Sequence, residues 1–209
     1  MLTLNIAGGK MFQLETIYHN DAEIDPIYTL NIDTSYYSET KPVSIETDII
    51  DWTNNQNKTS KRAFCNIDIF EFMEKTILQF DHVTIYRFLE HISFTQLNYF
   101  IYLVSTITRK DAIVDVIVPN YKILAQRILE EEKRFENNDY DKYDNFEGWN
   151  IELTTELLNE PSCPHASIWT PLRAKMFWEL EKRFEVIIDD EKFNFDGRDI
   201  YLRFYVKRI

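Results

Sequence analysis

Strand-like and helix-like segments alternate along the middle of this chain, and their order is the feature that most constrains its fold. Residues 80–86 and 112–118 are short, strongly apolar stretches that can be buried on both faces of a sheet. Residues 93–108 and 121–135 instead carry apolar side chains at helical spacing. Because neighbouring parallel strands need a long crossover between them, this alternation predicts an α/β fold with a mainly parallel sheet.

The same alternation extends toward both ends of the chain. Further strands are predicted at residues 2–7, 27–33 and 63–68, with another extended piece at 43–50, and helices at 69–78 and 170–184. Residues 185–188 and 200–207 are predicted to form a terminal antiparallel pair joined across Asp196-Gly197. The expected fold is a three-layer Rossmann-like sandwich that forms a single domain over residues 1–209, with an antiparallel C-terminal strand.

Two of the predicted helices have a clear apolar face. The faces consist of Ile69, Phe72, Met73 and Ile77 in the first, and Leu97, Phe100, Ile101 and Val104 in the second.

A glycine pair, Gly8-Gly9, follows the first predicted strand in a chain with only 4 glycines. Glycine is retained where φ must be positive or where a ligand presses against the main chain. In an open α/β sheet, ligands bind outside the carboxyl ends of the strands. Asp33, Asp68 and Glu90-His91 follow the second, third and fourth predicted strands. An acidic rim above glycine suits a ligand with a sugar, and the absence of a Gly-x-x-x-x-Gly-Lys-Ser loop argues against a phosphate-rich cofactor.

Composition excludes several classes of protein. The formal net charge is -12, whereas duplex-binding proteins usually present a basic face, so nucleic acid is disfavoured as a partner. No apolar run is long enough for a membrane helix. The two cysteines, Cys65 and Cys163, have no metal-binding spacing. We therefore expect a soluble cytoplasmic protein with reduced thiols, no metal and no membrane partner.

Five short motifs, in order along the chain, resemble those of class I S-adenosylmethionine-dependent methyltransferases of the type 11/12 kind. They are residues 4–9 (LNIAGG), 30–33 (LNID), 80–91 (FDHVTIYRFLEH), 117–120 (IVPN) and 165–171 (HASIWTP). The resemblance implies S-adenosylmethionine as cofactor. The motifs do not identify the methyl acceptor, and we expect a small molecule, a glycan or a protein.

The resemblance implies a role for each residue that matches the cofactor motifs. Ala7, Gly8 and Gly9 would face the methionine part of the cofactor, and Asp33 would bind its ribose. An acid after the third strand would lie near the adenine. Asp68 is the first choice for that position, and Asp48 is the second.

Three residues are candidates for the catalytic side of the pocket: Glu90, His91 and His165. Each has an alternative structural interpretation. Glu90 is also placed to cap the following helix or to contact solvent, His91 to act as a structural hydrogen-bonding group, and His165 to anchor a packed loop.

This sequence departs from the family pattern in three ways. The main alternative is therefore an inactive protein of the same fold with a structural or assembly role. Ala7 replaces the first glycine of the cofactor loop, and Lys110-Asp111 replaces a glycine turn before the fifth strand. No helices precede the first strand, so loops 52–62 and 136–164 are the predicted lid.

The sequence leaves the biological setting open. A nucleotide-sugar or dinucleotide enzyme is a further alternative, although its Gly-x-Gly-x-x-Gly loop is absent. The Asn-, Ile- and Lys-rich composition favours an AT-rich source such as a virus or phage, with the host cytoplasm or the virion as location. Homo-oligomers and hetero-oligomers are both open.

Overall fold

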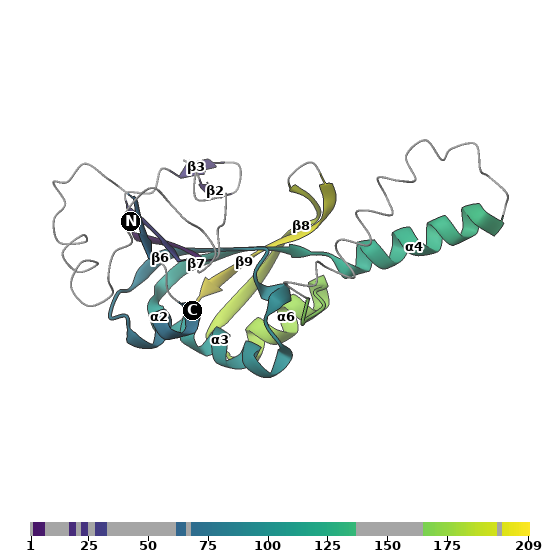
Figure 1. The fold of residues 1–209 in the computed structure, drawn as a ribbon. Coiled ribbons are helices and arrows are strands. Elements are labelled where there is room, and N and C mark those ends of the chain that lie inside the picture. Colours follow the sequence, from purple (N-terminus) through teal and green to yellow (C-terminus); the bar gives the residue numbers. More distant parts are fainter. Residues whose placement is uncertain are drawn as a thin grey trace.

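A seven-stranded sheet in the order β5-β4-β1-β6-β7-β9-β8 forms the centre of the molecule (Figure 1). The computed structural model describes residues 2–6, 17–19, 22–24, 28–32, 62–65, 68–136, 165–195 and 198–209. The strands of the sheet are β1 (Leu2–Ile6), β4 (Tyr28–Ile32), β5 (Arg62–Cys65), β6 (Phe80–Tyr86), β7 (Thr108–Pro119), β8 (Phe184–Phe195) and β9 (Arg198–Arg208). A separate two-stranded ribbon pairs β2 (Ile17–His19) with β3 (Ala22–Ile24).

The direction of the strands confirms the predicted fold class. β5, β4, β1, β6 and β7 are parallel, whereas β9 runs antiparallel to both β7 and β8. The chain moves outward from β1 to β4 and β5, and then returns to add β6 on the other side of β1. This reversal is the switch point of the sheet, where open α/β folds bind their ligands at the carboxyl ends of the strands.

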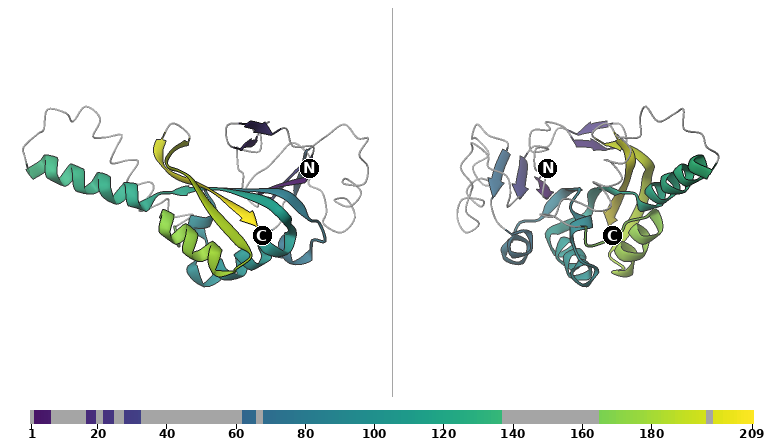
Figure 2. Two further views of the ribbon diagram at one scale, coloured as in Figure 1. Left: turned by 180° about the vertical axis from the view of Figure 1, so that it is seen from behind. Right: turned by 45° about the vertical axis from the view of Figure 1, so that its right-hand side comes forward.

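In the described part of the chain, three helices cover one face of this sheet: α2 (Ile69–Lys75), α3 (Phe94–Ile107) and α6 (Pro171–Leu180), as Figures 1 and 2 show. A fourth, α4 (Tyr121–Glu136), follows β7 and extends away from the sheet, and a short 3-10 helix, η2 (Leu89–His91), follows β6. No helix in the described ranges is both long enough and apolar enough to cross a membrane.

The two faces of the sheet differ in chemistry because side chains alternate along each strand. Leu4, Val83 and Ile85 belong to the large apolar core. Their neighbours Asn5 and Thr84 are buried polar residues, joined by a 2.8 Å bond from the threonine Oγ1 to the amide Oδ1. Burial on both faces of β6 confirms the prediction made from its sequence.

The helical faces are confirmed in α3 and partly wrong in α2. All four predicted core residues of α3 are 0% exposed, whereas Ile77 is 77% exposed. The reason is that α2 ends at Lys75 and Thr76 is already extended at ψ 138°. The helix predicted over 170–184 likewise ends at Leu180, and Lys182 at φ 52° turns the chain into β8.

Asp111, one of the two residues that stand in place of a glycine turn, lies within β7 and has a backbone conformation that glycine favours. Its φ is 65°, in the left-handed region that favours glycine. Aspartate is one of the residues that tolerates this region. An aspartate at this position is therefore compatible with the backbone conformation found there.

Candidate functional site

The carboxyl end of β6 turns sharply before it enters η2. Arg87 adopts a φ of 52°, an uncommon conformation for a residue with a side chain, and its N–H donates a 2.8 Å bond to the carbonyl of Ile117 in β7. Non-glycine residues in this region concentrate at functional sites. The turn leads directly to Glu90 and His91.

A distant segment, residues 165–170, is hydrogen-bonded onto η2. The N–H groups of Ala166 and Ser167 donate to the carbonyl of Glu90 at 2.7 and 3.0 Å. The Ser167 hydroxyl donates to the carbonyl of Leu89 at 2.8 Å and accepts from the indole Nε1 of Trp169 at 3.0 Å. Because Leu89 and Trp169 are 0% exposed, this connection is anchored in the core.

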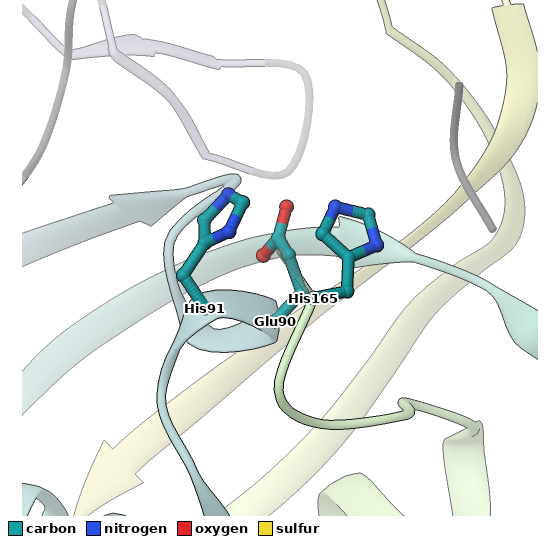
Figure 3. Close-up of side chains that lie close together, drawn as sticks. All are labelled: Glu90, His91 and His165. Atoms are coloured by element: carbon teal, nitrogen blue, oxygen red, sulfur yellow. The ribbon is translucent and has the colours of Figure 1, made fainter. Parts of the chain in front are cut away.

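Glu90, His91 and His165 come together at this junction, and we call them the Glu90 cluster. One ligand atom from each residue lies within 4.8 Å of those of the other two. In Figure 3 the carboxylate lies between the two imidazole rings, and each ring turns a nitrogen toward it. The glutamate is buried and both histidines are partly exposed. The structure therefore unites the three catalytic candidates named from the sequence.

Tyr121 supports the cluster from the first position of α4. Its hydroxyl lies 2.6 Å from Nδ1 of His165, and its N–H donates to the carbonyl of Trp169 at 3.0 Å. The rings of His91 and His165 pack edge to face, with centroids 5.0 Å apart. Sequence reasoning missed this tyrosine, although its place directly after the motif at 117–120 was an available signal.

The burial and contacts of Glu90 and His165 bear on their alternative structural roles. Glu90 is 0% exposed, so the solvent-contact interpretation is wrong. His165 does anchor a packed segment through Tyr121, but it also belongs to the cluster. Structural and chemical roles coincide in this residue.

Most of the predicted cofactor residues follow two neighbouring strand ends in the sequence. Ile6 and Ile32, the last residues of β1 and β4, are register partners, and Ile6 also pairs with Ile85 of β6. Ala7, Gly8, Gly9 and Asp33 follow these strand ends in the sequence. They and Asp48 lie outside the described residues, as do both predicted lid loops except for residues 62 and 136.

Asp68 is at the N-terminus of α2. Its Oδ1 accepts hydrogen bonds from the backbone N–H groups of Phe70 at 2.9 Å and Glu71 at 3.1 Å. It is therefore the N-cap of the helix, a position that aspartate favours. Its predicted place near the adenine stays a prediction.

A second buried polar group lies on the face of the sheet away from the helices, and we call it the Asp115 network. Arg203 donates to both carboxylate oxygens of Asp115, at 3.2 and 3.0 Å, and Tyr86 donates to Oδ2 at 2.7 Å. Burial raises the pKa of Asp115, against the opposing effect of the guanidinium. Burial and the adjacent carboxylate hold the pKa of Tyr86 well above its ordinary value.

Neither protein-family models nor curated sequences match this chain, but solved structures do. A SAM dependent methyltransferase from Archaeoglobus fulgidus matches with TM-score 0.52 and 12% identity, over 99% of this chain and 86% of that one. The N-methyltransferase NodS from Bradyrhizobium japonicum matches with TM-score 0.52 and 10% identity, over 99% and 85%.

The third comparison is with the 1,6-didemethyltoxoflavin-N1-methyltransferase of Burkholderia thailandensis, whose structure contains S-adenosylhomocysteine. It matches with TM-score 0.54 and 9% identity, over 99% of this chain and 70% of that one. At such identities the likeness is one of fold. This chain has the Rossmann-like fold of the SAM-dependent methyltransferases.

Proposed function

We propose that this protein is an S-adenosylmethionine-dependent methyltransferase. The observation that carries the proposal is the Glu90 cluster. It joins two segments far apart in the sequence at the carboxyl edge of the sheet, beside the switch point. Ligands of open α/β sheets bind at this edge. The fold shared with SAM-dependent methyltransferases supports the same activity.

The cofactor half of the pocket is assigned to the strand ends of β1 and β4. In this assignment Ala7, Gly8 and Gly9 contact the methionine part and Asp33 the ribose, with Asp68 or Asp48 near the adenine. The parallel register of Ile6 and Ile32 supports it, because it aligns the ends of the strands that precede the glycine pair and Asp33.

The acceptor half is assigned to the Glu90 cluster. Methyl transfer from a sulfonium mainly requires that nucleophile, methyl carbon and sulfur be aligned and that water be excluded. A hydroxyl or amine acceptor must also lose a proton, and the side chains of the Glu90 cluster are of the kind that promote such a loss. Small molecules, glycans and proteins are the acceptor classes proposed.

Thermal unfolding with S-adenosylmethionine and S-adenosylhomocysteine tests the proposal. Either ligand at a hundred times its dissociation constant should stabilise the protein by about 2.7 kcal/mol. Gly9→Val and Asp33→Ala should each abolish that stabilisation while the ligand-free protein stays folded. Glu185→Ala, at an exposed position of edge strand β8, is the matched control and should retain it.

Two outcomes would contradict parts of this proposal. If neither ligand at millimolar concentration shifts the unfolding temperature, the enzyme is excluded, and a non-catalytic structural or assembly protein of the same fold is favoured. If both variants retain binding, the cofactor pocket lies elsewhere.

A further inference from the structure

We propose that Glu90, His91 and His165 bind one divalent transition-metal ion. The three side chains offer two imidazole nitrogens and one carboxylate oxygen, all within 4.8 Å of one another. Around a tetrahedral ion with bonds of about 2.0–2.2 Å, ligand atoms lie about 3.3–3.6 Å apart. Small side-chain rotations therefore bring the three atoms onto a common centre.

The arrangement of ring nitrogens fits such a centre. In Figure 3 both rings turn a nitrogen toward the carboxylate between them. Nδ1 of His165 is held by the hydroxyl of Tyr121 at 2.6 Å, which leaves Nε2 to bind the ion. Histidines that bind metals usually have their other ring nitrogen fixed by such a hydrogen bond, which sets the tautomer and the ring orientation.

The backbone around the site is already organised. Both N–H groups that bind the Glu90 carbonyl come from the two residues after His165, so these ligands are fixed relative to one another. The carboxylate is buried, whereas the histidines are partly exposed. An ion would therefore contact a buried carboxylate on one side and two partly exposed imidazoles on the other, from which it can enter.

The donor set selects the class of ion. Magnesium and calcium prefer oxygen ligands, whereas imidazole suits zinc, iron, nickel and copper. Two histidines and one glutamate also form a three-ligand set that catalytic zinc sites use, and it leaves a coordination position open. The expected ions are thus Zn²⁺ and its neighbours in the first transition row.

A metal-free carboxylate–histidine base is the main competing explanation. Such a base needs one imidazole, whose second nitrogen is oriented by a carboxylate. Here two imidazoles converge on the same carboxylate, and one of them already has a separate orienting partner in Tyr121. A single base would leave the second histidine without a role, whereas a metal ion uses both histidines as ligands.

A catalytic role for the ion rests on the proposed methyltransferase function. A hydroxyl acceptor that occupies the open position has a lowered pKa and loses its proton to solvent. The acceptor oxygen then attacks the methyl carbon. The C–O bond forms as the C–S bond breaks, and the sulfonium becomes a neutral thioether. This site therefore favours an oxygen nucleophile among the acceptors.

Cobalt titration of the untagged full-length protein, after treatment with a chelator, tests the site. We expect saturable visible absorption at one Co²⁺ per chain, displaced by stoichiometric Zn²⁺ and not by excess Mg²⁺. His91→Asn and His165→Asn should each weaken binding at least about tenfold, and Tyr121→Phe, which removes an outer-shell partner, about 10- to 100-fold. Glu185→Ala, at an exposed position of edge strand β8, is the control and should leave binding unchanged.

The result that would overturn the proposal is absent or superstoichiometric binding, or binding that both histidine variants preserve. Far-UV circular dichroism of the metal-free variants checks that they fold. Because both histidines are partly exposed, their replacement is compatible with folding.

S-adenosylhomocysteine binding, measured on the same samples, separates the two proposals. If the protein binds S-adenosylhomocysteine but not Co²⁺, only the proposed metal site is rejected. If the protein binds Co²⁺ but neither adenosyl ligand has any effect, the metal site is supported and the methyltransferase function is rejected.

Discussion

Two buried carboxylates, Asp115 and Glu90, are both 0% exposed, yet different kinds of side chain surround them. The first is bound through both oxygens by Arg203, a cation that stays charged in proteins. The second lies beside two imidazoles, side chains that commonly bind metal ions. The comparison indicates that the Asp115 network holds strands together, whereas the Glu90 cluster is suited to bind something brought from outside.

The positions of the two groups agree with this difference. Asp115 and Arg203 connect β7 to the antiparallel strand β9, and Tyr86 adds β6. All three side chains belong to regular strands within the sheet. Glu90, His91 and His165 instead follow a strand end or precede a helix, where binding residues concentrate.

The largest effect is expected when the Asp115 network loses its cation. Arg203→Met leaves a buried carboxylate without its guanidinium and should lower the free energy of unfolding by about 3–5 kcal/mol. Urea denaturation measures the change. The double variant Asp115→Asn/Arg203→Met removes both charges and should recover much of that loss. If the double variant is no more stable than Arg203→Met, the stranded charge is not the cause.

A smaller effect is expected from Tyr86→Phe, which removes one hydrogen bond to Asp115. At neutral pH the free energy of unfolding should fall by about 1.5–3 kcal/mol, the range for a bond to a charged group.

The same variant has a signature in alkaline solution. Because the pKa of Tyr86 is raised above its ordinary 10.0, ionisation opposes folding. The stability from the neutral hydroxyl is complete below pH 10 and is lost as the pH rises toward the folded-state pKa. The wild type should therefore lose up to about 1.4 kcal/mol per pH unit more than Tyr86→Phe. Parallel stability curves above pH 10 would contradict this assignment.

The sequence was sufficient for features that depend on local periodicity. The apolar face of α3 and the strand β6 were predicted because spacing along one segment shows which side is buried. Edge strand β8 extends farther than predicted, to Phe195, since exposed acidic residues such as Asp190 are compatible with a sheet edge.

Contacts between residues far apart in the sequence could not be predicted from local periodicity. The three residues of the Glu90 cluster were named one by one, but nothing local indicated that His165 meets Glu90. That meeting depends on backbone bonds from Ala166 and Ser167 to the glutamate carbonyl. The pairing of Asp115 with Arg203, 88 positions apart, likewise depends on the register of β7 and β9.

The smallest effect on stability is expected from Glu90→Gln in chelator-treated protein, and it completes the comparison with Asp115. Glutamine keeps the volume of glutamate and its amide can accept from or donate to an imidazole, so the free energy of unfolding should change by less than about 1 kcal/mol. With Zn²⁺ at a hundred times its dissociation constant, the wild type should gain about 2.7 kcal/mol, and Glu90→Gln should lose most of that gain. A loss of several kcal/mol without metal would instead show that Glu90, like Asp115, is needed to hold the fold together.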